Sequence, residues 1–132
     1  TLIESSFQDN RRAGSDTMRI YIAGPYCPQD CTLHDAARIA QQNTNRAIDA
    51  GIELLEKGHH PYIPHLSHYI HQRMHYDYDK KWYDFDLVWL RLCEAIVMLP
   101  GWQQSTGAKQ ELEEAKKLGL KIYRSLDEVP KA

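Results

Sequence analysis

Short apolar runs alternate with longer segments of helical periodicity along this chain. The apolar runs cover residues 19–23, 61–64, 95–99 and 121–123, and they predict buried strands. Between them, residues 35–57, 82–93 and 106–118 repeat apolar side chains every three or four positions, as amphipathic helices do. Gly58 and Gly119 follow two of these segments and are suited to end helices. Residues 67–79 predict a further helix and loop.

Strands that alternate with helices predict an α/β fold with a parallel sheet covered on both faces. We expect a Rossmann-like or flavodoxin-like three-layer sandwich with a central parallel sheet of four to five strands. Residues 18–132 form this single domain, whereas residues 1–17 are polar and lack periodicity, which predicts a flexible N-terminal arm or leader. Parallel sheets bind ligands at the carboxyl ends of their strands, where Gly24-Pro25 and residues 100–106 fall.

One carboxylate lies on the apolar stripe of the helix predicted over residues 106–118. Ala108, Leu112, Ala115 and Leu118 define this stripe, and Glu111 falls inside it. The sequence therefore predicts that Glu111 faces the protein, near the helix N-terminus, where the helix dipole stabilises an anion. The structural alternative is that Glu111 caps a neighbouring loop.

A second carboxylate has a similar position on the helix predicted over residues 82–93. Asp86 lies in the middle of its apolar face, which consists of Trp82, Tyr83, Trp89, Leu90 and Cys93. A carboxylate there is costly unless it is hydrogen-bonded, paired or placed in a wet cleft, so Asp86 either pairs with a buried arginine or belongs to a site. Two inward carboxylates suit glycosidic bond cleavage, in which one attacks the anomeric carbon and another group manages the leaving-group proton.

Three motifs, in order along the chain, resemble the nucleoside 2-deoxyribosyltransferase superfamily, including its 2′-deoxynucleoside 5′-monophosphate N-glycosidase branch. Tyr21-Ile-Ala-Gly24-Pro25 is similar to its first-strand signature. Residues 86–94 resemble its helix of the form D-L-x-W-L-x-x-x-D, with Glu94 in place of the last Asp. Residues 105–115 resemble the loop and helix that carry the catalytic glutamate. The resemblance extends over residues 19–123.

The resemblance implies a role for each matching residue. Glu111 would be the nucleophile that forms a covalent glycosyl-enzyme, Tyr21 would orient its carboxylate, and Asp86 would contact the substrate and assist proton transfer. The substrate-binding residues that we expect are Gly24, Pro25, Tyr26, Ser105 and Gly107, together with His65 from the histidine-rich segment. Ser105 occupies the position of a phosphate-binding serine, although it is also suited to cap the helix that follows. No cofactor is implied, and relatives suggest a homodimer or larger homo-oligomer.

Two departures from the family pattern concern acceptor binding and dimer geometry. Only nine residues follow Tyr123, so we expect no counterpart in these residues of the distal element by which relatives lend a polar residue to the neighbouring subunit's site. Glu113 also replaces the glycine often found two residues after the nucleophile.

The composition of the chain limits the classes of partner and the cellular compartment that we expect. The formal net charge of −2 argues against a nucleic-acid polymer, which usually binds to a basic surface. No apolar run approaches the roughly 20 residues that span a bilayer, and no signal peptide is evident, so we expect neither membrane insertion nor secretion. Cys27, Cys31 and Cys93 are an odd number without zinc-like pairing, which favours reduced thiols in a cytoplasmic protein.

The histidine-rich segment between residues 59 and 75 raises the question of a metal. His71 and His75 have i, i+4 spacing, but no acidic or cysteine residue completes a recognisable ligand set, so we expect no metal site. A substrate-covering loop, in which Tyr62, His65 or His68 contacts the ligand, and a plain surface helix both remain open.

Three functions follow from this sequence. The favoured one is cleavage of the N-glycosidic bond of a nucleoside 5′-monophosphate through Glu111. The alternatives are exchange of bases by a 2-deoxyribosyltransferase with the same nucleophile, and a non-catalytic nucleotide-binding module.

Overall fold

The computed structural model describes residues 16–27, 33–74 and 79–132. The strands are β1 (Arg19–Ala23), β2 (His60–Tyr62), β3 (Ala95–Met98) and β4 (Lys121–Tyr123). The α-helices are α2 (Leu33–Glu56), α3 (Ser67–His71), α4 (Asp79–Leu90) and α5 (Thr106–Leu118), and three single turns are η1 (Pro64–Leu66), η2 (Trp102–Gln104) and η3 (Leu126–Glu128). Most of the predicted N-terminal arm, together with Cys31 and His75, lies outside the described residues.

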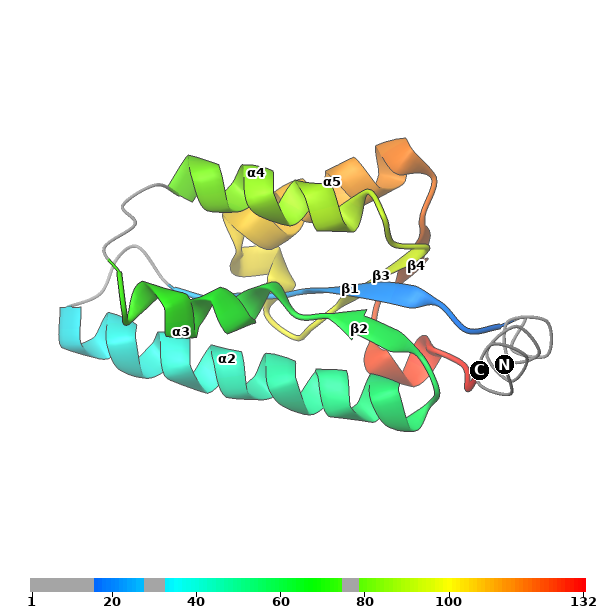
Figure 1. Ribbon diagram of the computed structural model, residues 1–132, viewed down its shortest axis with the longest axis horizontal. Coiled ribbons are helices and arrows are strands. Elements are labelled where there is room, and N and C mark those ends of the chain that lie inside the picture. The colour runs from blue at the N-terminus through cyan, green and yellow to red at the C-terminus, as the bar shows by residue number, and fades with distance from the viewer. Residues whose placement is uncertain (1–15, 28–32, 75–78) are drawn as a thin grey trace, which may run out of the picture.

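The four strands form one parallel sheet in the order β2-β1-β3-β4. Helix α2 covers one face of the sheet, and α4 and α5 cover the other (Figure 1). This arrangement confirms the predicted α/β three-layer sandwich, and its sheet has four of the predicted four to five strands in the described residues. The chain moves from β1 to β2 in one direction and then to β3 on the opposite side of β1, so the order reverses at β1. In open parallel sheets, ligands bind at the carboxyl end of such a reversal.

Alternate residues of β1 and β3 point to opposite faces of the sheet and build two cores. Ile20 and Ile22, with Ala95 and Val97, pack toward α2. Tyr21 and Ala23, with Ile96 and Met98, pack toward α4 and α5. Because both strands are buried on both faces, they read in sequence as continuous apolar runs.

The helix boundaries differ modestly from the sequence-based expectation. Helix α4 begins three residues before the predicted start and ends at Leu90. Strand β2 ends at Tyr62, because Pro64 begins the turn η1 instead of extending the strand. Gly58 and Gly119 adopt φ values of +91° and +74° after α2 and α5, as their predicted helix-ending role requires. None of the helices in the described parts of the chain has the length and hydropathy needed to cross a membrane.

The predicted apolar face of α4 is partly wrong. Leu87, Leu90 and Cys93 are buried against the sheet, whereas the Trp89 side chain remains 41% exposed. Leu87 and Leu90, three residues apart, set the inward phase of the helix, and Trp89 therefore falls at its edge. On α5, Ala108, Leu112 and Ala115 are buried as predicted, but Leu118 in the last turn is exposed.

Two glycines at the carboxyl edge of the sheet should respond to alanine in opposite ways. A Cβ on Gly24 would lie 2.9 Å from Cβ of Leu99, whereas a Cβ on Gly107 would meet no heavy atom within 4 Å. We expect Gly24→Ala to lower the free energy of unfolding by about 1–3 kcal/mol through overpacking. Gly107→Ala should leave it unchanged or raise it by up to about 1 kcal/mol. Urea denaturation measures both, and a loss of equal size in the two variants would contradict this packing argument.

Candidate active site

A buried tyrosine–glutamate pair lies at the centre of the α4–α5 side of the sheet. Glu111 is on the second turn of α5, and its residue is only 8% exposed. The hydroxyl of Tyr21, on the fully buried strand β1, donates a hydrogen bond to Oε2 of Glu111. Two residues 90 positions apart thus meet beneath α5. The predicted inward orientation of Glu111 is observed, and its partner is a strand residue, not a loop that it caps.

A second tyrosine–carboxylate pair lies beside the first. The hydroxyl of Tyr62 donates to Oδ1 of Asp86 at 3.2 Å, and Asp86 is partly buried. The β1–β2 register places Tyr62 directly opposite Tyr21, and the two ring centroids are 5.4 Å apart. Asp86 therefore lies in one cluster with Glu111, and its charge contributes to the raised pKa of Glu111. Its partner is a tyrosine and not the buried arginine of the structural alternative.

Burial raises the pKa of both carboxyl groups. The pKa of Glu111 rises to about 8, mainly through burial; the Tyr21 hydrogen bond opposes this rise, and the charge of Asp86 adds to it. Burial raises the pKa of Asp86 to about 7, and the Tyr62 hydrogen bond opposes the rise. Burial also raises the pKa of Tyr21 well above its ordinary value, so its hydroxyl remains a donor. Near neutral pH the site therefore holds exchangeable protons, as acid–base chemistry requires.

Aromatic side chains extend from these pairs along α4. The rings of Tyr62 and Trp89 stack with centroids 5.7 Å apart, and Phe85 meets Trp89 edge to face at 6.3 Å. Trp82 continues the row through an edge contact with Phe85 at 5.6 Å. These rings place flat apolar faces next to Asp86, and such faces suit the stacking of a planar heterocycle.

The carboxyl end of β1 is held by a buried histidine. Nε2 of His65 lies 3.2 Å from the carbonyl oxygen of Gly24 and 3.1 Å from that of Pro25. Since a carbonyl can only accept, Nε2 carries the hydrogen, while Nδ1 of His65 is buried without a hydrogen-bond partner. Burial lowers the pKa of His65, which keeps this ring neutral. The contact of Gly24 with Leu99 already explains why position 24 lacks a side chain.

Tyr26 lies in a hydrogen-bonded network with the histidine-rich segment. Its hydroxyl is 2.7 Å from Nδ1 of His68, and Nε2 of His68 is 3.0 Å from Oε1 of Gln41. The carbonyl oxygen of Tyr26 accepts from the Asn43 side chain at 2.8 Å. Among the residues that the structure describes, no group of three histidine, cysteine or acidic side chains is placed to hold a metal. The network joins the loop after β1 to α2 and α3.

Ser105 and Gly107 lie at the N-terminus of α5, less than two helical turns before Glu111. Oγ of Ser105 accepts the backbone N–H of Ala108 at 3.2 Å, so Ser105 is the N-cap of the helix. Its hydroxyl hydrogen is not used in that bond. Gly107 is exposed, with open space where a side chain would be. The helix N-terminus is thus pre-formed and accessible, one turn before the buried carboxylate.

Residues 18–124 match the family model described as a domain of unknown function, DUF4406. The chain belongs to the DUF4406 family. No curated protein matches its sequence. The match extends from the residue before β1 to the residue after β4, so the carboxylate pairs, the aromatic row and the N-terminus of α5 all lie within the DUF4406 domain.

The sequence located both carboxylates of this DUF4406 protein but missed one partner. The sequence places Tyr62 in the second predicted strand and suggests it as a ligand contact, whereas in the structure it is the hydrogen-bond donor to Asp86. The sequence did contain a signal for this partner. Tyr62 lies in the strand that follows α2, and two parallel strands joined by a helix usually lie next to each other in the sheet. Pairing the two tyrosines, however, required the register, which the apolar pattern does not specify.

Neutralising Glu111 should stabilise this DUF4406 protein at alkaline pH. Glu111 keeps its proton to about pH 8 in the folded state, whereas an ordinary glutamate loses it near 4.5. Between these values the unfolded chain binds fewer protons than the folded one, so stability falls as pH rises. At about 1.4 kcal/mol per pKa unit, we expect Glu111→Gln to raise the free energy of unfolding by about 2–4 kcal/mol at pH 8 and by little at pH 4.

Urea denaturation across this pH range measures the effect. Glu113→Gln is the matched control, because Glu113 lies on the same helix but is exposed and pairs with Lys116 at 3.1 Å. A stability difference between Glu111→Gln and the native protein that does not change from pH 4 to pH 8 would contradict the raised pKa.

Proposed function

We propose that this DUF4406 protein cleaves the N-glycosidic bond of a nucleoside 5′-monophosphate, with Glu111 as the nucleophile. The observation that carries the proposal is the pair of adjacent tyrosine–carboxylate contacts, Tyr21 with Glu111 and Tyr62 with Asp86. The three motifs that resemble the nucleoside 2-deoxyribosyltransferase superfamily contain Tyr21, Asp86 and Glu111. Membership of that superfamily is therefore part of the proposal.

In the first step, the Glu111 carboxylate attacks the anomeric carbon while the bond from that carbon to the base nitrogen breaks. Because both pKa values lie near neutrality, the two carboxyl groups share protons, and the reactive form is the one in which Glu111 is ionised and Asp86 is protonated. The hydrogen bond from Tyr21 to Oε2 favours this ionised form of Glu111 and leaves Oε1 for the attack. Asp86, with a pKa of about 7, transfers its proton to the departing base. The products are a glycosyl ester of Glu111, the neutral base and an ionised Asp86.

In the second step, water attacks the anomeric carbon of the ester. Ionised Asp86 accepts a proton from this water as the bond to Glu111 breaks, which restores the Glu111 carboxylate and the protonated Asp86. The sugar phosphate then carries the new hydroxyl group. Each carboxyl group thus ends the cycle in its starting form, and no cofactor is needed.

The surroundings of the carboxylates support a nucleotide as the substrate. Trp89 and Tyr62 are suited to stack on a nucleobase beside Asp86. The N-terminus of α5, with the free hydroxyl hydrogen of Ser105 and the open space at Gly107, is suited to a phosphate. A nucleotide with its base on the aromatic row and its phosphate at α5 would have its sugar near Glu111.

Replacing Glu111 should abolish base release. We expect Glu111→Gln to lower kcat by about 10³-fold or more, because the amide keeps the shape and the Tyr21 contact but is not a nucleophile. The measurement is chromatographic release of free base from a panel of ribo- and deoxynucleosides, with and without a 5′-phosphate. Glu113→Gln should retain native activity.

The same assay, repeated with a second free base present, separates hydrolysis from transfer. Formation of sugar phosphate is the expected result, whereas an exchanged nucleoside would identify a deoxyribosyltransferase with the same nucleophile. If the native protein binds nucleotides but releases no base from any substrate in the panel, the enzymatic proposal is wrong and a binding module remains.

Changes at Ser105 should separate phosphate binding from helix capping. Aspartate and asparagine both cap helices as well as serine does, so neither variant should unfold α5. The carboxylate of Ser105→Asp would repel a phosphate, and we expect it to raise KM for the monophosphate about tenfold or more relative to Ser105→Asn. Equal KM values for the two variants, at equal thermal stability, would exclude a phosphate at this position.

A further inference from the structure

The backbone that follows β1 is held by two buried polar side chains. Nε2 of His65 donates to the carbonyl oxygens of Gly24 and Pro25 at 3.2 and 3.1 Å. Nδ2 of Asn43 donates to the carbonyl oxygen of Tyr26 at 2.8 Å. His65 is 5% exposed and Asn43 is 7% exposed, so both donors have left water to make these bonds. The carbonyl groups of three successive residues are therefore fixed in direction.

These bonds turn the carbonyl groups toward helix α2. Asn43 belongs to α2, and His65 belongs to η1, which contacts α2. No peptide bond in the described residues is cis. In a planar trans peptide the C=O and N–H groups point in opposite directions, so the N–H of Tyr26, which shares a peptide with the Pro25 carbonyl, points away from α2. It therefore faces the side of the sheet that α4 and α5 cover, where Glu111 lies (Figure 1).

The N–H of Tyr26 has no acceptor within the part of the chain that the structure describes. A Cβ on Gly101 would lie 3.3 Å from Cγ of Pro25, so the loop after β1 contacts the segment that leads through η2 to Ser105, the N-cap of α5. Backbone N–H groups of loops and of helix N-termini are suited to bind phosphate oxygens. A phosphate between the loop and α5 would accept from both.

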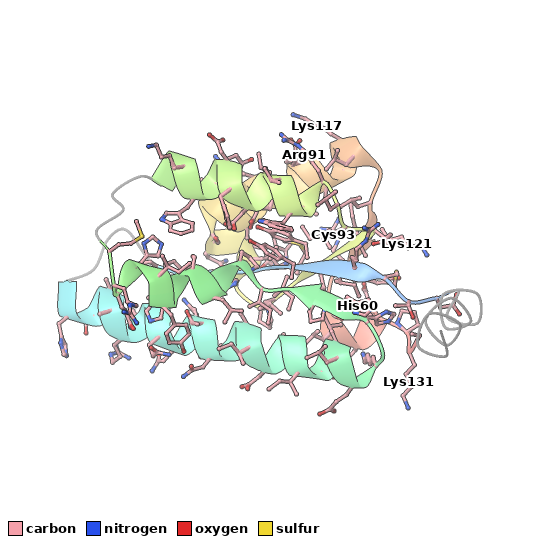
Figure 2. The ribbon with its side chains drawn as sticks, in the orientation of Figure 1. His60, Arg91, Cys93, Lys117, Lys121 and Lys131 are labelled. Carbon is pink, nitrogen blue, oxygen red and sulfur yellow. The ribbon has the colours of Figure 1, made fainter. Side chains whose placement is uncertain are left out.

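The lysines at the other end of the sheet do not serve this position. Lys121 is the first residue of β4, and Lys117 lies in the last turn of α5. Figure 2 shows both, with Lys131, toward the amino-terminal ends of the strands and away from the loop after β1. A phosphate at the carboxyl edge would gain nothing from these three charges, so the direction of the nearby N–H groups matters for its binding.

We propose that Asn43 and His65 are positioning residues, which hold the N–H of Tyr26 so that it donates to the 5′-phosphate of the substrate. This inference rests on the proposed function and adds to it a second side of the phosphate site, opposite the N-terminus of α5. His65, which the sequence analysis expects to contact the substrate, acts through the backbone instead. Above its second pKa of about 6, a phosphate monoester has only acceptor oxygens, which match an N–H that can only donate.

Calorimetric titration of the full chain, carrying Glu111→Gln so that nothing turns over, tests the role of Asn43. The ligands are the nucleoside 5′-monophosphates of the base-release panel, the same nucleosides without phosphate, and inorganic phosphate. Asn43→Asp keeps the shape of the side chain but removes the donor. We expect it to raise Kd for the monophosphate about tenfold, and Kd for the nucleoside by less than about twofold. Asn45→Asp, on an exposed position of the same helix, is the matched control and should change neither Kd.

A pair of substitutions at His65 separates positioning from direct contact. The side-chain amide of His65→Gln can still donate to the two carbonyl groups, whereas His65→Met cannot. We expect His65→Gln to bind the monophosphate within about twofold of the parent protein and His65→Met about tenfold more weakly. Equal losses in the two variants would mean that the imidazole itself contacts the substrate, and the positioning role would be wrong. Circular dichroism checks that each variant is folded, and this pair decides if Asn43→Asp is not.

The amide of Tyr26 can also be observed directly in protein labelled with ¹⁵N-tyrosine. Its resonance, identified by its loss in Tyr26→Phe, should shift on titration with the monophosphate or inorganic phosphate and not with the nucleoside. A resonance that stays in place at saturating monophosphate, or a protein that binds no monophosphate, would overturn the proposal. If the amide responds but the native protein releases no base, the proposed activity fails and this inference stands. If base is released but Asn43→Asp and Asn45→Asp have equal Kd values, this inference fails alone.

Discussion

The hydrogen bond from Tyr21 to Glu111 is the contact on which the candidate site depends. A carboxyl group that is almost completely buried loses its hydration, and this loss is tolerated only when the group is protonated or receives a strong hydrogen bond. Tyr21 can supply that bond because it lies in the central strand of the sheet, where its backbone is fixed on both sides by β2 and β3. A central strand of the sheet therefore positions the buried carboxyl group.

The sheet topology explains why the second pair lies beside the first. Strand β1 pairs with β2 so that Tyr21 and Tyr62 are neighbours, and both rings point to the face covered by α4 and α5. Each of these helices contributes one carboxylate to its tyrosine. Helix α2 covers the other face and packs on the first core, so it supports the sheet without entering the site. The two buried carboxylates and helix α2 thus lie on opposite faces of one sheet.

Helix α4 connects three parts of the molecule. Its inner side, through Leu87 and Leu90, is part of the core, Asp86 points toward the site, and Phe85 and Val88 remain exposed. Trp89 stacks on Tyr62 and is itself partly exposed, so it lies between the site and these exposed side chains.

The sequence by itself determined the fold class, the order of strands and helices, and the inward position of Glu111. These features follow from apolar periodicity, which a chain must satisfy locally to bury its backbone. Only the tertiary structure decided which side chains contact one another. The strand register placed Tyr62 beside Tyr21 and within hydrogen-bonding distance of Asp86. Ser105 became the N-cap of α5. The burial of Leu87 and Leu90 set the orientation of α4 and left Trp89 at the edge of its buried face. Such choices depend on how distant elements pack, because one helical or strand pattern is compatible with several neighbours until the sheet is assembled.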